Sequence, residues 1–264
     1  MTANPRDVLN RPAPAPDFTI RYGDHPDQVA DVRLPPGDAT RPLIIFIHGG
    51  FWQRRYDRAH TGPLAADLAS RGYPVATIEY RRMGQDGGGW PGTFDDVAAA
   101  VRATPALIRE QIEARGRIAP DLSRPILAGH SAGGHLALWV VRTGDQRGVV
   151  ALAPIADLVL AQRLGLGDGA TAALLGGGPA RVPDRYAYAD PAQLLPARCR
   201  VIIVHGTEDR QVPIEVSRSY AAAAQKAGDD TSLVELPGTE HYAVIDPRSP
   251  AWSTVLGALG AFVG

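Results

Sequence analysis

The segment that most constrains this chain is Gly129-His130-Ser131-Ala132-Gly133, which matches the pattern G-x-S-x-G. An apolar run, Pro125 to Ala128, precedes it, and a segment of helical character, Gly134 to Val141, follows it. This order predicts a strand, a sharp turn and a helix, with the serine hydroxyl exposed on the turn. The five-residue pattern also occurs in ordinary glycine-rich turns. The flanking strand and helix are therefore what favour a nucleophilic serine here.

Short β-branched runs alternate with longer alanine-rich segments along most of the chain. Such alternation is typical of strands and crossover helices in a mostly parallel sheet with flanking helices. Two early strands have no helix between them, which indicates an antiparallel edge. The expected strands are 18–22, 29–34, 43–47, 75–79, 126–128, 149–153, 201–204 and 232–235, and the expected helices are 59–70, 93–115, 132–141, 214–227 and 249–262.

Length and charge narrow the class of protein. The 264 residues suit a single α/β domain. With 27 basic and 28 acidic residues the formal net charge is −1, which favours neither nucleic acid nor a membrane surface as a partner. Residues 1–18 lack the apolar core of a secretory signal, and no apolar stretch is long enough for a transmembrane helix. We therefore expect a cytoplasmic protein with a small-molecule substrate, and the composition is compatible with a homodimer.

Two segments depart from the alternation of strands and helices. Residues 157–196 are rich in glycine and too long for a plain connection, so we expect a cap or lid insertion with small helices at 158–164 and 171–175. Residues 1–17 carry Pro12, Pro14 and Pro16 in alternation, which predicts an extended, polyproline-like arm. The sequence leaves open whether this arm docks on the body or stays free.

A serine hydroxyl needs a base to accept its proton, and the base needs a third group to orient it. A carboxylate for that third position follows the expected strand 201–204, in the segment Glu208-Asp209. Of these neighbours we assign Asp209, because it completes the pattern Gly-x-x-Asp-x-x-Val-Pro with Gly206 and Val212-Pro213. The competing interpretation is an acidic residue that merely stabilises the start of the next helix.

His241 is the expected base, since it lies between the last expected strand and the C-terminal helix. The chain order of serine, acid and histidine excludes the histidines before Ser131. His135 lies four residues after the serine on the same helix, where it is too constrained to reach back. His205 ends a strand, and we interpret it as a packed or hydrogen-bonded loop residue.

A negatively charged intermediate would also need hydrogen-bond donors, and losing one such donor raises a reaction barrier by about 3 kcal/mol. One expected donor is the backbone N–H of Ala132, at the start of the helix after the serine. The others lie in His48-Gly49-Gly50-Phe51-Trp52, directly after the third expected strand. We assign Gly50 and Phe51 to this oxyanion hole and expect His48 to hold the loop by hydrogen bonding.

Together, these segments resemble the α/β-hydrolase superfamily and its hormone-sensitive-lipase-like branch. Within that branch the H-G-G-x-W loop and the G-H-S-A-G-G-H-L segment from Gly129 are most similar to the kynurenine formamidase (arylformamidase) family and its bacterial relatives. The resemblance implies an α/β-hydrolase fold and hydrolysis of a carbonyl–heteroatom bond through an acyl-enzyme. N-formyl-L-kynurenine would be the signature substrate.

Three functions remain open at this stage. They are an arylformamidase, a carboxylesterase that acts on small acyl esters, and a non-catalytic ligand-binding protein on a hydrolase fold. A His-Glu-x-x-His pair, a Walker loop and a dinucleotide-binding loop are absent from the sequence, so we expect no metal and no cofactor.

A flat aromatic substrate would need aromatic walls and, if it carries a carboxylate, a cation. Aromatic residues cluster after the catalytic strands, and we expect Trp52, Tyr56, Tyr80 and Trp90 to contact the substrate. The sequence does not choose among the arginines available for a carboxylate, which are Arg54, Arg55, Arg81, Arg82 and Arg185.

Overall fold

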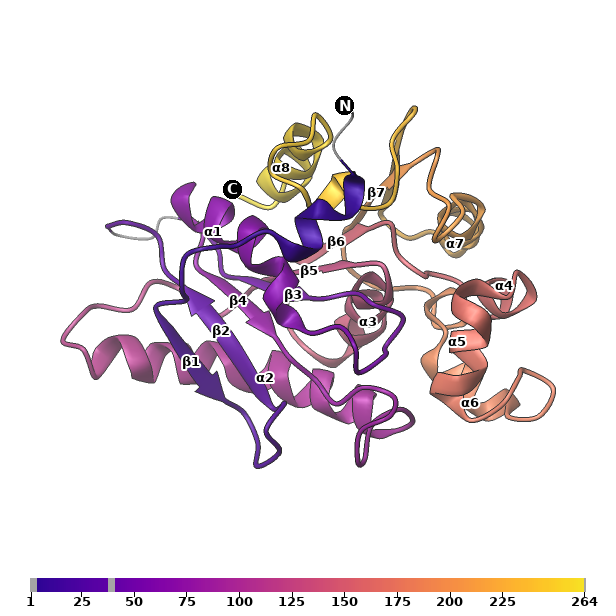
Figure 1. The fold of residues 1–264 in the computed structure, drawn as a ribbon, viewed down its shortest axis with the longest axis horizontal. Helices are drawn as coiled ribbons and strands as arrows, with labels where there is room; N and C mark the ends of the chain where they lie inside the picture. The colour runs from indigo at the N-terminus through magenta and orange to yellow at the C-terminus, as the bar shows by residue number, and fades with distance from the viewer. Residues whose placement is uncertain (1–3, 38–40, 264) are drawn as a thin grey trace.

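The computed structural model describes residues 4–37 and 41–263 and contains a central twisted sheet between two layers of helices (Figure 1). Within these residues the sheet has eight strands in the order β1-β2-β4-β3-β5-β6-β7-β8. The pairs β1–β2 and β2–β4 are antiparallel, whereas β4, β3, β5, β6, β7 and β8 are parallel to one another in that order. This confirms the mostly parallel sheet with an antiparallel edge. The strands are β1 (Phe18–Arg21), β2 (Val29–Arg33), β3 (Ile44–Ile47), β4 (Val75–Ile78), β5 (Ile126–His130), β6 (Gly148–Leu152), β7 (Val201–Gly206) and β8 (Thr231–Leu236).

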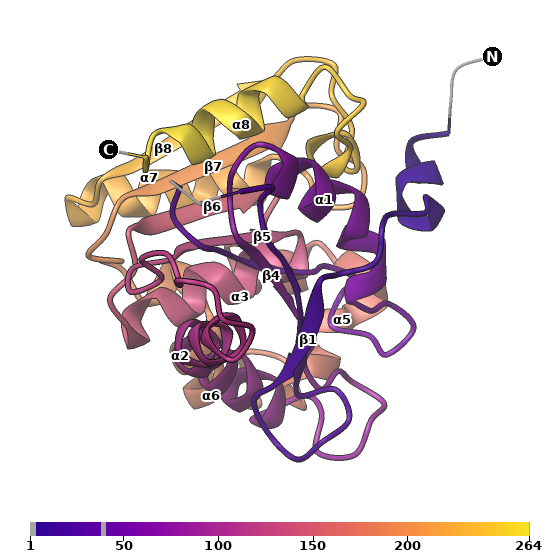
Figure 2. The same cartoon turned by 90° about the vertical axis from the view of Figure 1, so that its left-hand side faces the viewer.

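The helices cover both faces of this sheet. Helices α2, α3 and α7 pack on one face, and α1 and α8 pack on the other, as the turned view in Figure 2 shows. None of the helices in the described ranges combines the length and apolarity needed to cross a membrane. These helices are α1 (Gly62–Ser70), α2 (Gly92–Glu113), α3 (Ala132–Val140), α7 (Glu215–Ala227) and α8 (Trp252–Gly260), with short 3-10 turns η2 (Arg58–Thr61), η3 (Val141–Thr143) and η5 (Ala243–Ile245).

Strand β3 shows why the central strands read as unbroken apolar runs. Ile45 and Ile47 belong to the core beneath α2 and α3, whereas Ile44 and Phe46 belong to the core beneath α1 and α8. Successive side chains of a strand point to opposite faces, so a strand covered on both faces needs apolar residues at every position. The parallel arrangement brings the carboxyl ends of β3, β5 and β7 to one edge of the sheet.

The segment 157–196 contains three helices beside α7: α4 (Leu158–Arg163), α5 (Leu166–Leu175) and α6 (Pro183–Ala189), followed by the turn η4 (Pro191–Gln193) (Figure 1). The sequence analysis missed α6, although Pro183 at its first position is a recognised signal for a helix start. The Trp90 N–H donates to the Leu174 carbonyl at 3.0 Å, so this segment is tied to the loop before α2. That it moves as a lid stays a prediction.

The arm before β1 differs from the predicted extended form. Residues Pro5–Asn10 form a 3-10 helix, η1, because the Asn4 side chain caps it and Pro5 occupies its first position. Val8 is 1% exposed and packs with the α1 and α8 layer. Arg11 forms a double hydrogen bond with the Asp246 carboxylate, one of 2.9 Å. The arm therefore docks on the body.

We expect Gly133→Ala to destabilise the fold, because an added Cβ would lie 2.0 Å from the carbonyl oxygen of Ile47 and 2.5 Å from that of His48. Backbone atoms cannot rotate away from such an overlap. Gly257→Ala is the matched control, since Gly257 also lies in a helix and a Cβ there meets nothing within 4 Å. Its substitution should stabilise by about 0.5–1 kcal/mol through helix propensity. Thermal unfolding of both variants tests this, and a Gly133→Ala melting temperature equal to that of the wild type would contradict the packing.

Candidate active site

Ser131 lies on a strained turn between β5 and α3. Its backbone has φ 56° and ψ −119°, a conformation that residues other than glycine rarely adopt. The turn is so tight that a Cβ on Gly129 would lie 2.3 Å from the carbonyl oxygen of Gly133. Both glycines of the motif are therefore required by the backbone, and together they present the serine at the carboxyl end of the central strand.

His241 and Asp209 meet at this same end of the sheet. The His241 Nδ1 atom lies 2.5 Å from the Asp209 Oδ2 atom, and both side chains are buried. An ionised carboxylate only accepts hydrogen bonds, so Nδ1 carries the proton and Nε2 is left as an acceptor. Ser131 and His241 line one pocket. The structure thus brings together the three side chains that the sequence analysis selected from separate loops.

Asp209 is held by four donors. Its Oδ1 atom accepts from the backbone N–H groups of Gln211 and Val212, each at 2.8 Å. Its Oδ2 atom accepts from His241 and also from His205 Nε2 at 3.1 Å. Burial opposes ionisation, but the hydrogen bonds from the two histidines outweigh it and hold the pKa of Asp209 well below its usual range.

Two residues near Asp209, Glu208 and His205, differ from the candidate triad in their surroundings. Glu208 is exposed, whereas Asp209 is buried, which agrees with the choice of Asp209. His205 is hydrogen bonded, as expected, but its partner is the candidate catalytic acid itself. Its Nε2 lies 3.1 Å from Asp209 Oδ2 and 2.9 Å from the Val212 carbonyl oxygen. Both partners are acceptors, so Nε2 carries the proton and Nδ1 accepts from the Ser217 hydroxyl at 2.7 Å.

A second histidine that the sequence analysis did not assign supports His241. His130 Nε2 lies 3.0 Å from the backbone carbonyl of His241, and the two rings are 4.5 Å apart. A carbonyl only accepts, so the His130 nitrogen donates. Burial, aided by the charge of His241, lowers the pKa of His130, which keeps the ring neutral. The sequence signal was its place beside the serine in the motif.

The loop after β3 lies directly against the serine turn. A Cβ on Gly49 would be 2.8 Å from the His130 carbonyl oxygen and 3.0 Å from the Ser131 Cβ. Gly50, at φ 112°, and Phe51, at φ 50°, follow in the left-handed region and line the serine pocket. Ala132 is fully buried at the start of α3. The expected oxyanion residues therefore gather around one side of Ser131.

His48 holds this loop through a buried carboxylate that the sequence analysis missed. Its Nδ1 lies 2.8 Å from the Gly49 carbonyl, and its Nε2 lies 2.8 Å from Glu79 Oε1. These two contacts hold the ring between the loop backbone and Glu79. Burial raises the pKa of Glu79, but the charge and hydrogen bond of His48, together with Arg82, lower it to about 2.

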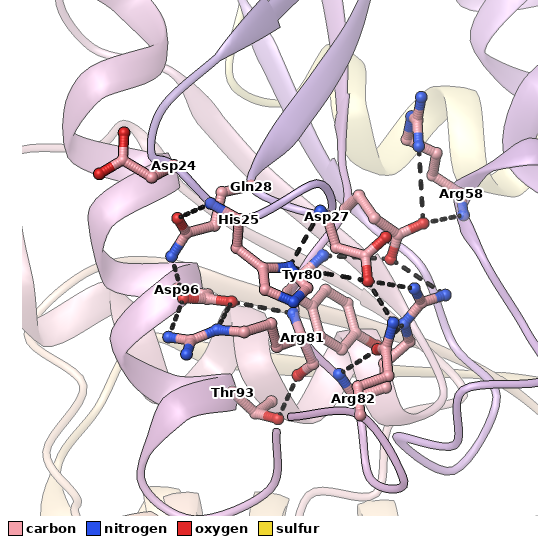
Figure 3. Close-up of polar contacts among 12 residues, drawn as sticks. Asp24, His25, Asp27, Gln28, Arg58, Tyr80, Arg81, Arg82, Thr93 and Asp96 are labelled. Carbon is pink, nitrogen blue, oxygen red and sulfur yellow. Dashed lines mark hydrogen bonds and ion pairs between the residues drawn. The ribbon is translucent and has the colours of Figure 1, made fainter. Parts of the chain in front are cut away.

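The charged residues after β4 are committed to one another (Figure 3). Arg81 makes a double hydrogen bond to Asp96 at 2.8 and 2.7 Å, and Arg82 pairs with Asp27 at 3.1 Å. These arginines are therefore not free to bind a substrate carboxylate. Two further candidates donate to backbone carbonyls, Arg54 to Gly84 and Arg185 to Leu175. Of the five arginines considered for binding a substrate carboxylate, Arg55 is the candidate that remains.

The pocket at Ser131 has a volume of about 140 Å³. Tyr56 lines it, as expected, but three other expected aromatic contacts lie elsewhere. Trp52 and Tyr80 are 0% exposed, and Tyr80 stacks on His48. Trp90 packs against Phe94 and Tyr188. These placements correct the prediction that the three residues contact substrate. The pocket is lined by Arg6, Leu9, Gly50, Phe51, Arg55, Tyr56, His60, His130, Ser131, Gln211, His241 and Tyr242.

A family model named BD-FAE matches residues 30–223, which is more than half of the chain. The chain belongs to the BD-FAE family. The match spans the sheet from β2 to β7 and includes Ser131 and Asp209, whereas β8 and His241 lie beyond its end. The fold of this BD-FAE chain is that of the α/β-hydrolases.

The chain is also similar to individual proteins, at low sequence identity. Kynurenine formamidase of Danio rerio is 24% identical over 86% of this chain and 75% of its own length. A probable isoprenylcysteine alpha-carbonyl methylesterase of Arabidopsis thaliana is 26% identical over 84% of this chain and 56% of its own length. Among solved structures, esterase B from Lactobacillus rhamnosis is similar with a TM-score of 0.78 and 21% identity, over 98% of this chain and 89% of that one.

We expect Glu79→Gln to lower the free energy of unfolding at neutral pH by about 3 kcal/mol, because it removes the buried carboxylate that His48 and Arg82 contact. The folded-state pKa of Glu79 lies at about 2, below its usual 4.5. Its contribution is therefore complete above its unfolded-state pKa and is lost as the pH falls toward 2. Urea unfolding at pH 7, 5 and 3 should show a weaker pH dependence in the variant than in the wild type.

Glu235→Gln is the control for this measurement, since Glu235 pairs with Arg218 on the surface. Surface pairs contribute less than about 1 kcal/mol. Equal pH dependence of Glu79→Gln and wild type would show that Glu79 is not the group that holds His48.

Proposed function

We propose that this BD-FAE protein is a serine hydrolase of the α/β-hydrolase type that removes small acyl groups through an acyl-enzyme. One observation carries the proposal. Ser131, on its strained turn, shares a pocket with His241, whose Nδ1 lies 2.5 Å from a buried, ionised Asp209. A hydroxyl, an imidazole with a free Nε2 and an orienting carboxylate are the three parts that nucleophilic acyl transfer requires.

In the proposed reaction His241 Nε2 takes the proton of Ser131 as its Oγ attacks the substrate carbonyl carbon. The carbonyl π electrons move to the oxygen, which the backbone N–H groups of Gly50, Phe51 and Ala132 would stabilise. Collapse of this intermediate breaks the bond to the leaving amine or alcohol, which receives the proton from His241. Water then attacks the acyl-enzyme by the same route and releases the acid and the free serine.

The surroundings of the histidine suit this cycle. The imidazolium that forms transiently faces Asp209, whose lowered pKa keeps it ionised. His130 donates to the backbone carbonyl of His241 and so fixes the base in place without adding a positive charge. His60 lines the same pocket, and burial lowers its pKa to about 4, so it too is neutral.

For the substrate we propose a formyl or similarly small acyl group on an aryl amine, an arylformamidase-like activity. The pocket of about 140 Å³ is smaller than the roughly 300–1,000 Å³ of sites for drug-sized ligands, which favours a small acyl group. Phe51, Tyr56 and Tyr242 give it aromatic walls for a flat leaving group. The kynurenine formamidase relatives support this choice, whereas the methylesterase and esterase relatives support hydrolysis of small esters as the second candidate.

Ser131→Ala should lower kcat by about 10⁶-fold on both N-formyl-L-kynurenine and p-nitrophenyl acetate, because the nucleophile is lost. A fluorophosphonate probe should label the wild type and leave the variant unlabelled. Absence of labelling in the wild type would instead support a non-catalytic ligand-binding protein. If the wild type cleaves the ester but cleaves the formamide no faster than the uncatalysed reaction, the arylformamidase assignment fails and the esterase assignment stands.

We expect Asp209→Asn to lower kcat by about 10⁴-fold, because an amide in that position favours the wrong tautomer of His241. Steady-state kinetics on p-nitrophenyl acetate measures the loss. Glu208→Gln, at the exposed neighbouring position, should keep its activity within about twofold of the wild type. A larger loss for Glu208→Gln than for Asp209→Asn would exchange the two roles.

A further inference from the structure

Two arginines stand at the wall of the serine pocket, and no acidic residue lines it. Arg6 comes from η1, and Arg55 comes from the loop that follows the oxyanion residues. The histidines of the pocket carry no negative charge that would offset the two arginines. Arg6 also lines an adjoining groove that holds Glu208 and Glu240, and there the Glu240 carboxylate accepts from the backbone N–H of Tyr242. The pocket therefore presents positive charge to whatever enters it.

Neither guanidinium has an acidic partner. Among the described residues no carboxylate oxygen lies within 4.0 Å of Arg6 or Arg55, whereas Arg11, Arg58 and Arg82 nearby are all paired. Arg6 lies over the ring of Tyr242 at 5.7 Å, and Arg55 lies over the ring of Tyr56 at 5.0 Å. Such stacking orients a guanidinium. Arg6 also hydrogen bonds the Tyr242 hydroxyl, and because a guanidinium has five N–H donors, others stay available for an anion.

Their positions relative to the reacting groups fix which part of a substrate they would meet. Tyr242 follows His241, the group that returns a proton to the leaving group, so Arg6 lies on the leaving-group side. Arg55 lies over Tyr56, which packs against Gly50 of the oxyanion loop: a Cβ on Gly50 would be 2.5 Å from the Tyr56 Cβ. The two arginines therefore border the pocket, Arg6 beside the base and Arg55 beside the loop after β3. A formyl or acetyl group carries no carboxylate, so an anion that meets them would belong to the leaving group.

The arm is anchored well enough to hold Arg6 in place. Val8 is 1% exposed, and Arg11 pairs with Asp246, which itself follows η5. Arg6 lies between the Asn4 cap and these two contacts in a single short helix. A side chain held in this way loses less freedom on binding than one on a free tail.

We propose that Arg6 and Arg55 form a carboxylate-binding pair that selects substrates with an anionic leaving group. The proposal rests on the proposed hydrolase function and adds the substrate class to it. A guanidinium matches a carboxylate through two parallel N–H donors, and two of them around one pocket favour an anion over a neutral group of the same shape.

The test compares 4-acetoxybenzoate with its methyl ester, which share the acetyl group and the aromatic ring. We expect the wild type to prefer the anion by kcat/KM, and Arg6→Gln or Arg55→Gln to lower the ratio of anion to methyl ester by about tenfold. Arg6→Lys should restore part of the ratio. Arg54→Gln is the matched control, because Arg54 adjoins Arg55 in sequence but donates to the Gly84 carbonyl, and its ratio should equal that of the wild type.

Equal ratios in Arg6→Gln, Arg55→Gln and the wild type would overturn the pair while leaving the hydrolase function intact. If the wild type cleaves neither ester, the hydrolase function is judged by fluorophosphonate labelling and formamide hydrolysis, and binding tests the pair separately. Calorimetry would measure the affinity of 4-hydroxybenzoate for Ser131→Ala with and without Arg6→Gln. A loss of about tenfold supports the pair, and unchanged affinity overturns it.

Discussion

The close approach of two backbone segments determines the candidate site. The loop after β3 and the turn after β5 touch at positions where only glycine fits, with Gly133 against the end of β3 and Gly49 against the serine turn. This contact brings Gly49 of one segment against Ser131 of the other. A rigid parallel sheet supports both segments, so the geometry does not depend on long side chains finding their places. The other features of the site refine an arrangement that the backbone has already set.

A layer of buried charge lies beneath that contact. Glu79 bonds His48, His48 bonds the loop, and Arg82 links Glu79 to Asp27 near the antiparallel edge. Buried charges are costly to remove from water, and they stabilise a structure only when each one is paired and hydrogen bonded. Here every member has such a partner, so displacement of one group would leave the others unsatisfied. The network therefore resists movement of the loop after β3.

Sequence patterns predicted the parts of this structure that depend on local order. Every expected strand is present, and Ser131, Asp209 and His241 meet as expected, because residues that end parallel strands must gather at one edge. The aromatic predictions were weaker: a large apolar residue after a strand serves the core as readily as a pocket, and Trp52 and Tyr80 are in the core. Glu79 and His130 were missed because their partners are distant in sequence. The 3-10 helix of the arm was missed because the prediction of an extended arm rested on Pro12, Pro14 and Pro16, whereas the helix start is at Asn4-Pro5.

The helix η1 contributes to the pocket wall, whereas the sheet carries the candidate catalytic residues. The candidate catalytic groups lie on the strands, turns and loops of the sheet, while part of the pocket wall belongs to a segment that precedes the first strand and takes no part in the sheet. Changes in residues 5–10 can therefore alter the shape and charge at the entrance without disturbing the machinery beneath. A relative with the same sheet but a different leading segment would present a different pocket wall to whatever enters it.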